Sequence, residues 1–510
     1  MELTITYEHD SQLMNETIHV DNTESAVFSI VGQHLLRADI PSRLTVTDET
    51  GTFKAAYDLK KRGTFVKNGR RMPSLFVQEA AYADYNNQIQ PSIYDEKYLT
   101  CINPEGNNYK FYRLIPQNIS GHTVAIDVEY GSIDSDTCEP RRVQQPYESR
   151  MFWIRYYEKL SKGYTDQTNI YCKAKIVARS NSNSDHSPKT VNGMVYQMLM
   201  RYAKHHVEES LAQPQMLTKA QVKAARREFN KLCEMKTLRG FNTHLVKLIG
   251  YSPRNIGSRS LGNAHLQSLM PVYPLGSHPD KDSLQKEFSR IINREEQLLL
   301  AMEAVVAGME PVVTKTKEEE SFERYGIHVS EATQQQKEEV YQYLPTSLRS
   351  RVKAIYSVKP EEQEQRFEAY CKKNHIEKVR KLWHGSVNEN WASILQNSLQ
   401  IRPTAANGRM FGDGLYFAPS PDKSWGYTSA YGTRWARGNS NTAFMGLYKT
   451  AYGNPWMVTG WGGRYSQSSV HNNGYDCVHA TSANTGLRAD EIIFYDNDAI
   501  CLNYLVEFAG

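Results

Sequence analysis

The sequence predicts a multidomain protein of the α+β class, on three observations. The chain has 510 residues, which exceeds the size of a single hydrophobic core and indicates three or four domains. Residues 1–175 contain short runs of alternating β-branched and polar side chains, whereas residues 190–310 carry apolar side chains at helical spacing. After residue 320 aromatic and β-branched residues become frequent again, so we expect a mainly β C-terminal domain with one or two helices.

The composition is that of an ordinary globular protein, with 23% charged and 40% hydrophobic residues. No apolar run reaches about 18 residues and the first residues do not resemble a signal peptide, so a secreted or membrane-spanning protein is not expected. The seven cysteines include no Cys-x-x-Cys pair, which indicates free thiols inside a cell. A zinc site at 477–479 is disfavoured because no second ligand pair follows. The net charge of +4 permits an acidic partner such as DNA without requiring one.

The N-terminal module, residues 1–95, is expected to be β-rich. Alternating residues at 3–7 and 43–47 predict short strands, and the sequence assigns them no chemistry. Six Lys or Arg side chains bracket two glycines between residues 60 and 71. A solvated hairpin is the simpler interpretation of this cluster, and a loop that contacts phosphate groups is the alternative.

The second module, residues 98–175, is expected to combine a small sheet with a helix. The segments 108–114 and 123–131 alternate as paired strands do, and the segment 152–160 carries apolar side chains at helical spacing. Gly163 follows where a helix C-cap is expected. The polar segment 180–185 predicts a linker.

The third module, residues 190–310, is expected to be an α-helical bundle. Thr218 followed by Gln221 is the signature of a capping box at a helix start. Apolar residues then recur on one face over 222–232 and again over 284–305. These stripes indicate core packing between helices rather than a cofactor site.

Several residues of the C-terminal part have the chemistry needed to hold and cleave a nicotinamide–ribose bond. Such an enzyme must grip the carboxamide, hold the ring and stabilise an oxocarbenium-like ribose. Backbone groups at Gly385 can approach the carboxamide because no Cβ intervenes, and Ser386 adds a hydroxyl. Tyr416 and Tyr427 can sandwich the ring. Glu491 can favour positive charge on the ribose and polarise an attacking group.

Each of these residues alone has a more ordinary explanation. His384 by itself is more often a structural histidine, and single tyrosines are more often core residues. The segment 412–414 is not a dinucleotide-binding fingerprint, because no further glycine follows at the required spacing at the start of a helix. The residues themselves therefore predict a nucleotide pocket and no more.

Beyond this, the C-terminal part resembles the catalytic domain of the poly(ADP-ribose) polymerase family. The resemblance extends in order over residues 325–510 and is carried by the segments 382–386, 408–418, 423–427, 491–496 and 504–508. It implies an ADP-ribosyltransferase domain over residues 320–510 that uses NAD+ as a co-substrate and no metal ion. It also implies a catalytic triad of His384, Tyr416 and Glu491.

The resemblance further assigns binding roles by position. His384 would contact the adenosine ribose, while Gly385 and Ser424 would hold the carboxamide. Tyr427 would stack on the nicotinamide face opposite Tyr416. Ser386 and Arg402 would lie on the adenine side, although the arginine of the family aligns with either Arg402 or Gln400. Family members that lack the glutamate at the position of Glu491 are usually limited to single ADP-ribose transfer.

The upstream modules resemble further parts of the same family. Residues 190–310 are similar to its helical regulatory domain, which covers the NAD site until an activating signal loosens it. Residues 98–175 resemble a WGR domain, with Tyr130-Gly131-Ser132 where Trp-Gly-Arg is expected, so one arginine contact to phosphate is lost. Nearby arginines either compensate or form a solvated face; they are Arg141, Arg142, Arg150 and Arg155.

The resemblance therefore implies an NAD+-dependent protein ADP-ribosyltransferase that modifies itself and other proteins and extends the product into poly(ADP-ribose). DNA ends would be contacted through the WGR-like module, as in a DNA damage response, and no membrane is expected as a partner. The protein would lie in the nucleus of a eukaryote or the cytoplasm of a bacterium. Two alternatives remain, namely a mono-ADP-ribosyltransferase and a nucleic-acid-binding scaffold with a vestigial transferase fold.

Overall fold

The computed structural model describes most of the chain from residue 95 onward, and before residue 95 it describes six strands. From residue 95, the residues outside the described part are 105–107, 120–121, 134–140, 146–154, 157–158, 161, 172–187, 213, 215–216, 257–265, 267, 272–280, 310–320, 402–409, 461–462 and 464. The chain divides into two compact units, Met1–Ala174 and Lys175–Gly510. Both units combine strands with helical segments, so the α+β class is confirmed.

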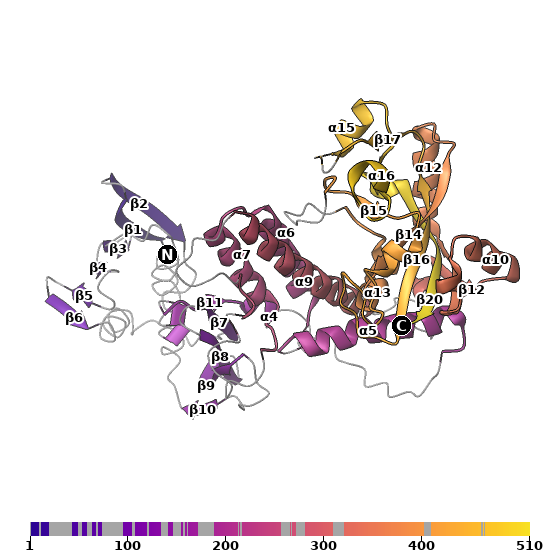
Figure 1. The fold of residues 1–510 in the computed structure, drawn as a ribbon. Helices are drawn as coiled ribbons and strands as arrows, with labels where there is room; N and C mark the ends of the chain where they lie inside the picture. Colours follow the sequence, from indigo (N-terminus) through magenta and orange to yellow (C-terminus); the bar gives the residue numbers. More distant parts are fainter. Residues whose placement is uncertain are drawn as a thin grey trace. The chain divides into compact units, whose positions relative to one another are not determined.

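The first unit begins with a six-stranded antiparallel sheet in the order β2-β1-β3-β4-β5-β6 (Figure 1). Its strands are β1 (Glu2–His9), β2 (Gln12–His19), β3 (Arg43–Asp48), β4 (Lys54–Asp58), β5 (Thr64–Lys67) and β6 (Arg70–Pro73). The strands predicted at 3–7 and 43–47 are confirmed. Within the basic cluster, Lys67 pairs with Arg70 across a β5–β6 hairpin, whereas residues 60–63 lie outside the described part.

A five-stranded antiparallel sheet follows in the order β10-β9-β8-β7-β11. Its strands are β7 (Lys97–Asn103), β8 (Asn108–Ile119), β9 (His122–Ser132), β10 (Arg141–Gln145) and β11 (Thr165–Asp166), and α4 (Thr168–Tyr171) comes next. Leu99 and Leu114 are fully buried against Tyr156 and Leu160 of the predicted helical segment. Gly163 has φ of 86°, which suits the glycine expected at the end of that segment.

The residues that replace the Trp-Gly-Arg triplet lie at the end of β9. The Tyr130 ring packs against Tyr112 with 6.2 Å between ring centroids. The Ser132 hydroxyl donates a hydrogen bond to the Tyr109 carbonyl over 3.2 Å. The register of β9 and β10 sets the backbone of Arg141 opposite Tyr130. Strand β10 therefore has an arginine opposite the residue that replaces the tryptophan of the triplet. Arg150 lies outside the described residues.

The helices described at the start of the second unit are α5 (Val191–Ser210), α6 (Lys219–Glu234), α7 (Leu238–Tyr251) and α9 (Lys281–Gly308). The predicted capping box is confirmed, because the Thr218 hydroxyl accepts from the Gln221 N–H and the Gln221 side chain accepts from the Thr218 N–H. Phe241 of α7 and Phe288 of α9 stack in the core with 3.9 Å between centroids. Among the described helices of the chain, none combines the length and apolar character needed to cross a membrane.

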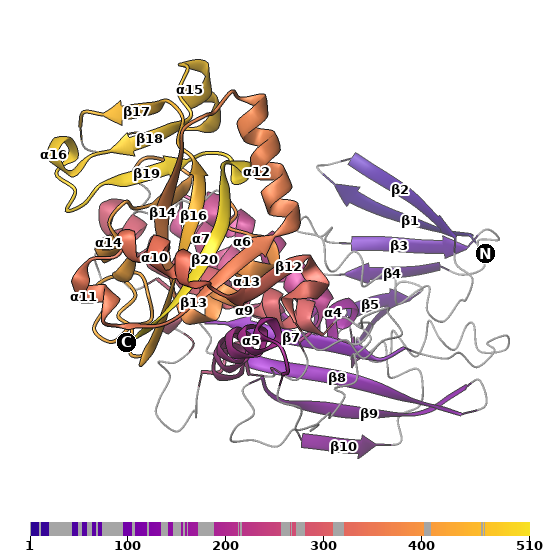
Figure 2. The same cartoon turned by 90° about the vertical axis from the view of Figure 1, so that its right-hand side faces the viewer.

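The C-terminal domain contains two sheets (Figure 2). The larger has the order β12-β13-β20-β16-β14, with β12 (Ile327–Glu331), β13 (Val352–Pro360), β14 (Val379–Ser386), β16 (Thr442–Ala451) and β20 (Ile500–Ala509). The smaller has the order β15-β19-β18-β17, with β15 (Leu415–Phe417), β17 (Pro455–Val458), β18 (Cys477–Ala480) and β19 (Glu491–Phe494). Helical segments cover about as many of the described residues of this domain as strands do, so the prediction of a mainly β domain is met only in part.

The described part of this domain has more helices than the one or two predicted, and the longest of them are α10 (Gln334–Gln342) and α12 (Glu361–Lys373). Shorter helical segments that the sequence did not predict are α11 (Thr346–Arg349), α13 (Trp391–Asn397), α14 (Pro421–Trp425), α15 (Gln467–Asn472), α16 (Ser482–Thr485), η3 (Phe322–Tyr325), η4 (Asn388–Asn390) and η5 (Asn497–Ala499). With seven residues or fewer, none of these shorter segments offers the repeated apolar spacing that a sequence pattern needs.

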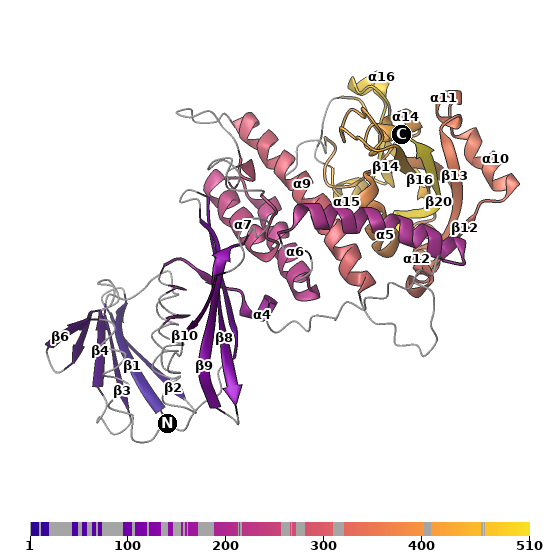
Figure 3. The same ribbon diagram turned by 90° about the horizontal axis from the view of Figure 1, so that it is seen from below.

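Helix α5 packs directly on the C-terminal domain (Figure 3). The Asn192 side chain accepts from the Phe322 N–H over 2.8 Å and donates to the Ile327 carbonyl over 2.9 Å. Asn192 is 2% exposed, so both hydrogen bonds are shielded from water. Tyr196 adds an edge-to-face contact with Phe322 at 5.1 Å. Both α5 and α9 also lie against η4, which begins two residues after β14 ends.

Candidate active site

The candidate site lies where the two sheets of the C-terminal domain meet. Trp383 in β14 exchanges two backbone hydrogen bonds with Ala418, at 2.9 and 3.0 Å, and Ala418 directly follows β15. Strand β15 pairs in turn with β19. His384, Tyr416 and Glu491 therefore lie on three neighbouring strands. The backbones of the outer two strands are roughly 10 Å apart, because adjacent strands are separated by about 4.8 Å.

His384 is held in one tautomer by the backbone of β15. Its Nδ1 lies 3.1 Å from the Tyr416 carbonyl oxygen, so Nδ1 carries the hydrogen and donates it. Burial lowers the pKa of His384, and the hydrogen bond to Tyr416 offsets this only in part. The neutral ring then leaves Nε2 as a hydrogen-bond acceptor. This is the group that a ribose hydroxyl requires.

Gly385 provides a backbone edge that a side chain would block. Residues two apart in a strand direct their N–H and C=O groups to the same edge, so those of Gly385 point to the edge where Trp383 bonds Ala418. A Cβ at residue 385 would lie 1.9 Å from the Ser424 carbonyl oxygen. The Ser424 hydroxyl donates to the Trp383 carbonyl over 3.1 Å and is 4% exposed. Only glycine at this position allows Ser424 to approach so closely.

The Tyr416 hydroxyl is held by two hydrogen bonds. It donates to the Gly412 carbonyl over 2.8 Å and accepts from the Phe411 N–H over 3.1 Å. Gly412 has φ of 89°, and a Cβ there would meet the Tyr465 carbonyl at 2.1 Å. The segment that leads into β15 therefore requires glycine, and it holds the Tyr416 ring in one orientation.

Glu491, at the start of β19, is the buried carboxylate of the site. Its Oε1 lies 2.5 Å from Nζ of Lys423, and the two side chains are only 10% and 14% exposed. Its Oε2 is buried and has no hydrogen-bond partner among the described residues. Because a buried polar atom without a partner is costly, Oε2 marks a position where a ligand hydroxyl fits.

Tyr427 follows α14 and lies within electrostatic reach of Glu491. Burial, and second the charge of Glu491, raise the pKa of Tyr427 to about 12. The residue is nevertheless 41% exposed, so part of its ring is accessible to a ligand. Its N–H donates to the Ser424 carbonyl over 3.1 Å, which ties it to the same short helix.

The residues expected on the adenine side are only partly described. The Ser386 hydroxyl accepts a hydrogen bond from the Asn390 side chain over 2.9 Å. Gln400 bonds Asn397 and Asn497, at 2.8 and 2.9 Å, so its amide is already engaged. Arg402 lies outside the described residues. The structure therefore brings together all the predicted site residues except Arg402, for which it gives no position.

Lys423 is a site residue for which the sequence predicted no role. It lies beside Ser424 in one of the segments that carry the resemblance, but its partner Glu491 lies far along the chain. Lys423 also donates to the Ala489 carbonyl over 3.3 Å. The only available signal was general: a buried glutamate such as Glu491 needs a positively charged partner, and Lys423 is a basic residue in a segment that carries the resemblance.

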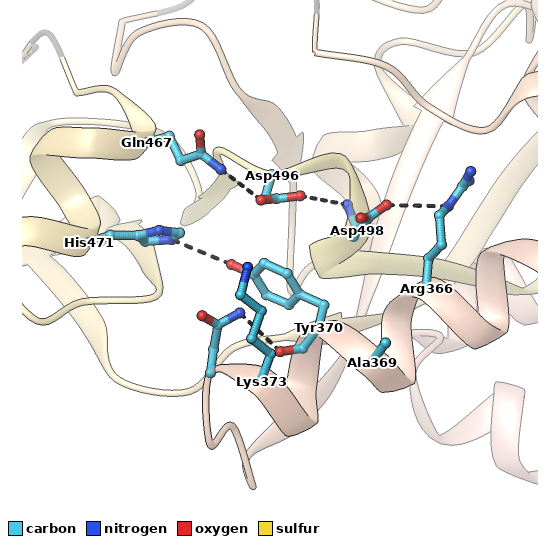
Figure 4. A pocket seen from close by; sticks show the side chains of 9 residues that line it. Arg366, Ala369, Tyr370, Lys373, Gln467, His471, Asp496 and Asp498 are labelled. Atoms are coloured by element: carbon cyan, nitrogen blue, oxygen red, sulfur yellow. Dashed lines mark hydrogen bonds and ion pairs between the residues drawn. The ribbon is translucent and has the colours of Figure 1, made fainter.

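A cavity of about 290 Å³ lies elsewhere in this domain, beyond the far end of β19 (Figure 4). Its lining comes from α12, α15 and η5 and does not include the predicted site residues. Both of its carboxylates already have partners: Arg366 pairs with Asp498 at 3.3 Å, and Gln467 donates to Asp496 over 2.7 Å. The orphaned carboxylate oxygen and the glycine edge mark the active site, and this cavity does not.

The comparison with known families agrees with this geometry. Residues 329–459 match the model of the poly(ADP-ribose) polymerase catalytic domain. The C-terminal domain is therefore similar to the catalytic domain of this family. The matched range includes His384, Tyr416 and Tyr427 but ends before Glu491, so the place of Glu491 rests on the pairing of β15 with β19.

Three relatives extend the comparison. A poly(ADP-ribose) polymerase-like protein, 100L, of Invertebrate iridescent virus 6 is 29% identical over 160 residues, which are 30% of this chain and 83% of that protein. Poly(ADP-ribose) polymerase 2 of Zea mays is 24% identical over 414 residues, 73% of this chain and 60% of that protein. The mono-ADP-ribosyltransferase PARP3 of Gallus gallus is 26% identical over 264 residues, 49% of this chain and 46% of that protein.

The family and the names of its relatives support ADP-ribosyltransferase activity with NAD+ as the substrate. The chain spans 60% of the maize relative and 46% of the chicken relative. Among the described residues no cluster of His, Cys, Asp or Glu suits a metal ion.

Replacing Gly385 with alanine is expected to displace Ser424, because the new Cβ would overlap its carbonyl oxygen. We expect kcat/KM for NAD+ to fall about a hundredfold, as positional errors of about 1 Å do in other sites. Gly460→Ala is the matched control, since a Cβ there meets nothing within 4 Å. Steady-state nicotinamide release measures both variants. Unchanged kinetics in folded Gly385→Ala protein would exclude this edge from the site.

Stability should depend on pH through His384. Its pKa in the folded state lies below the ordinary value of 6.5, so the unfolded chain binds the proton first as the pH falls. The free energy of unfolding should therefore decrease as the pH drops below 6.5 and be constant above it. Denaturant unfolding of the wild type and of His384→Asn over this range gives a difference that isolates the contribution. A difference independent of pH would contradict a buried neutral ring.

Proposed function

We propose that the protein transfers ADP-ribose from NAD+ to protein side chains, its own included, and extends the product into a chain. The observation that carries the proposal is the buried Glu491 carboxylate, with one oxygen paired to Lys423 and the other without a partner. The residues around it fit NAD+, because the Gly385 edge offers a donor and an acceptor side by side for the carboxamide.

The bound NAD+ would be held by groups that already have fixed positions. Gly385 and Ser424 bind the carboxamide, and Tyr416 and Tyr427 flank the ring. Nε2 of His384 accepts a hydrogen bond from the adenosine ribose. Because all of these groups except the Tyr427 ring are fixed by β14, β15 and α14 before NAD+ binds, little free energy is lost in ordering them.

Glu491 would act on both substrates of the transfer. Oε2 accepts a hydrogen bond from the nicotinamide ribose and orients the attacking hydroxyl of the acceptor, whose proton the carboxylate takes. Lys423 gives the buried carboxylate a positively charged partner. Nicotinamide is the group released when the acceptor replaces it on the ribose.

Single transfer is the second candidate, because one relative is named as a mono-ADP-ribosyltransferase and another as a poly(ADP-ribose) polymerase. The buried glutamate supports chain extension, since the hydroxyl of a bound ADP-ribose unit needs a base to attack. A third candidate, a nucleic-acid-binding scaffold with an inactive domain, requires that the intact protein releases no nicotinamide, with or without broken DNA.

Glu491→Gln is expected to reduce chain elongation by a factor of about 10² to 10⁴, since the amide cannot accept the proton. Binding of NAD+ should be largely kept because the two side chains are similar in size. Glu507→Gln is the matched control, a carboxylate of β20 bonded to Tyr356. Gels of protein incubated with labelled NAD+ show a smear for polymer and a sharp shifted band for single transfer. Polymer of unchanged length would remove Glu491 from the mechanism.

The helices α5 to α9 would act as a regulatory bundle. Binding of DNA ends to the WGR-like module would be the signal that changes the bundle. What supports this is the contact of α5 and α9 with η4, next to the strand that carries His384. A regulator of this kind works only if the signal binds the open state better than the closed one. Protein acceptors and DNA ends are the partners that the proposal requires.

Asn192→Ala is expected to increase basal nicotinamide release about fivefold or more, because it removes two shielded hydrogen bonds between α5 and the C-terminal domain. Met194→Ala on the exposed face of α5 is the control. Broken DNA should stimulate the wild type more than the variant, which is already partly open. Equal basal rates in folded wild-type and variant protein would contradict the regulatory role.

A further inference from the structure

The loop between α14 and β16 exposes an unusual number of aromatic rings. Of the seven large apolar residues exposed in the described part of the chain, three lie in this loop. Tyr427 is 41%, Trp435 56% and Tyr431 75% exposed. Exposed aromatic residues that gather in one place usually have a binding or positioning role. The loop begins at the helix that carries Ser424, so this role concerns the candidate active site.

Trp435 stacks on Tyr427. Their ring centroids are 6.0 Å apart and the rings are inclined by only 18°. Trp435 reaches this position through Gly426, whose carbonyl accepts a hydrogen bond from the Trp435 N–H over 2.9 Å. A Cβ on residue 426 would lie 2.9 Å from Cδ1 of the indole. The glycine before Tyr427 thus leaves room for the indole.

Trp435 lies in a turn that is closed by side-chain hydrogen bonds. Thr433 is buried and its hydroxyl donates to the Thr428 carbonyl over 2.9 Å, while it accepts from the Gly438 N–H over 3.0 Å. Thr428 is fully buried below it. The guanidinium of Arg434 lies over the Trp435 ring at 4.8 Å. Two contacts besides Tyr427 therefore hold the indole. They are the hydrogen bond of the Trp435 backbone to Gly426 and the Arg434 guanidinium over the ring.

Tyr427 has few other restraints. Among the described residues, the aromatic ring that packs against Tyr427 is that of Trp435, and the Tyr427 backbone N–H donates to the Ser424 carbonyl. A half-exposed phenol can rotate about χ1 and χ2 unless a neighbour restricts it. An offset stack of two aromatic rings is worth enough to favour one rotamer.

We propose that Trp435 is a positioning residue that holds the Tyr427 ring in the orientation that nicotinamide needs. This inference rests on the proposed function, in which Tyr427 flanks the nicotinamide. Trp435 does not touch the ligand. It acts through Tyr427, and it makes the affinity for the nicotinamide end of NAD+ depend on a residue outside the pocket.

The test uses the full chain with three substitutions: Trp435→Ala, Trp435→Phe and, as the matched control in the same loop, Tyr431→Ala. We expect Trp435→Ala to raise KM for NAD+ and the inhibition constant of free nicotinamide about three- to tenfold, with kcat changed less than about twofold. Trp435→Phe should restore most of the affinity, since phenylalanine also stacks. Tyr431→Ala should resemble the wild type.

The outcomes separate this inference from the proposed function. If the wild type releases nicotinamide and Trp435→Ala has the same kinetic constants, the inference alone is overturned. Equal losses in Trp435→Ala and Tyr431→Ala also overturn it, because the loop as a whole would then be responsible. A fall in kcat without a change in KM assigns Trp435 another role. Wild-type protein that neither binds nor releases nicotinamide overturns both proposals.

Discussion

The bridge between Trp383 and Ala418 is the interaction on which the candidate site depends. Two backbone hydrogen bonds join the large sheet to the small one at this point, and they set β14 beside β15. Every other relation follows from them: His384 reaches the Tyr416 carbonyl, and the pairing of β15 with β19 brings Glu491 into range. Because backbone bonds define the distances, side-chain substitutions on these strands, apart from those of the closely packed Gly385, change chemistry more readily than geometry.

The site also depends on an ion pair that occupies only one of the two carboxylate oxygens of Glu491. Lys423 and Glu491 are both largely buried, and a buried ion pair contributes little stability in itself because both charges lose water. Its effect is on chemistry: one carboxylate oxygen is occupied and the other is left without a partner. An arrangement that is poor for stability is well suited to binding a ligand hydroxyl, which explains why such a pair is found at this junction.

Local features could be predicted from the sequence and distant ones could not. The capping box of Thr218 and Gln221 and the strands of the first module depend on neighbouring residues, and they are confirmed. The pairing of Lys423 with Glu491 depends on how β19 returns beside α14, which no spacing encodes. The same holds for the stack of Trp435 on Tyr427. The resemblance supplied the site residues without explaining what holds them in place.

Helix α5 connects this site to the rest of the second unit. Asn192 bonds the backbone on both sides of η3, so α5 and the start of the C-terminal domain move together or lose two hydrogen bonds. On its other side, η4 lies against α5 and α9 and directly follows the strand that holds His384. A change in the helices therefore has a short structural route to the strand that carries His384. Regulation through this route needs only that the closed arrangement be favoured by a few kcal/mol, which two shielded hydrogen bonds and one aromatic contact can provide.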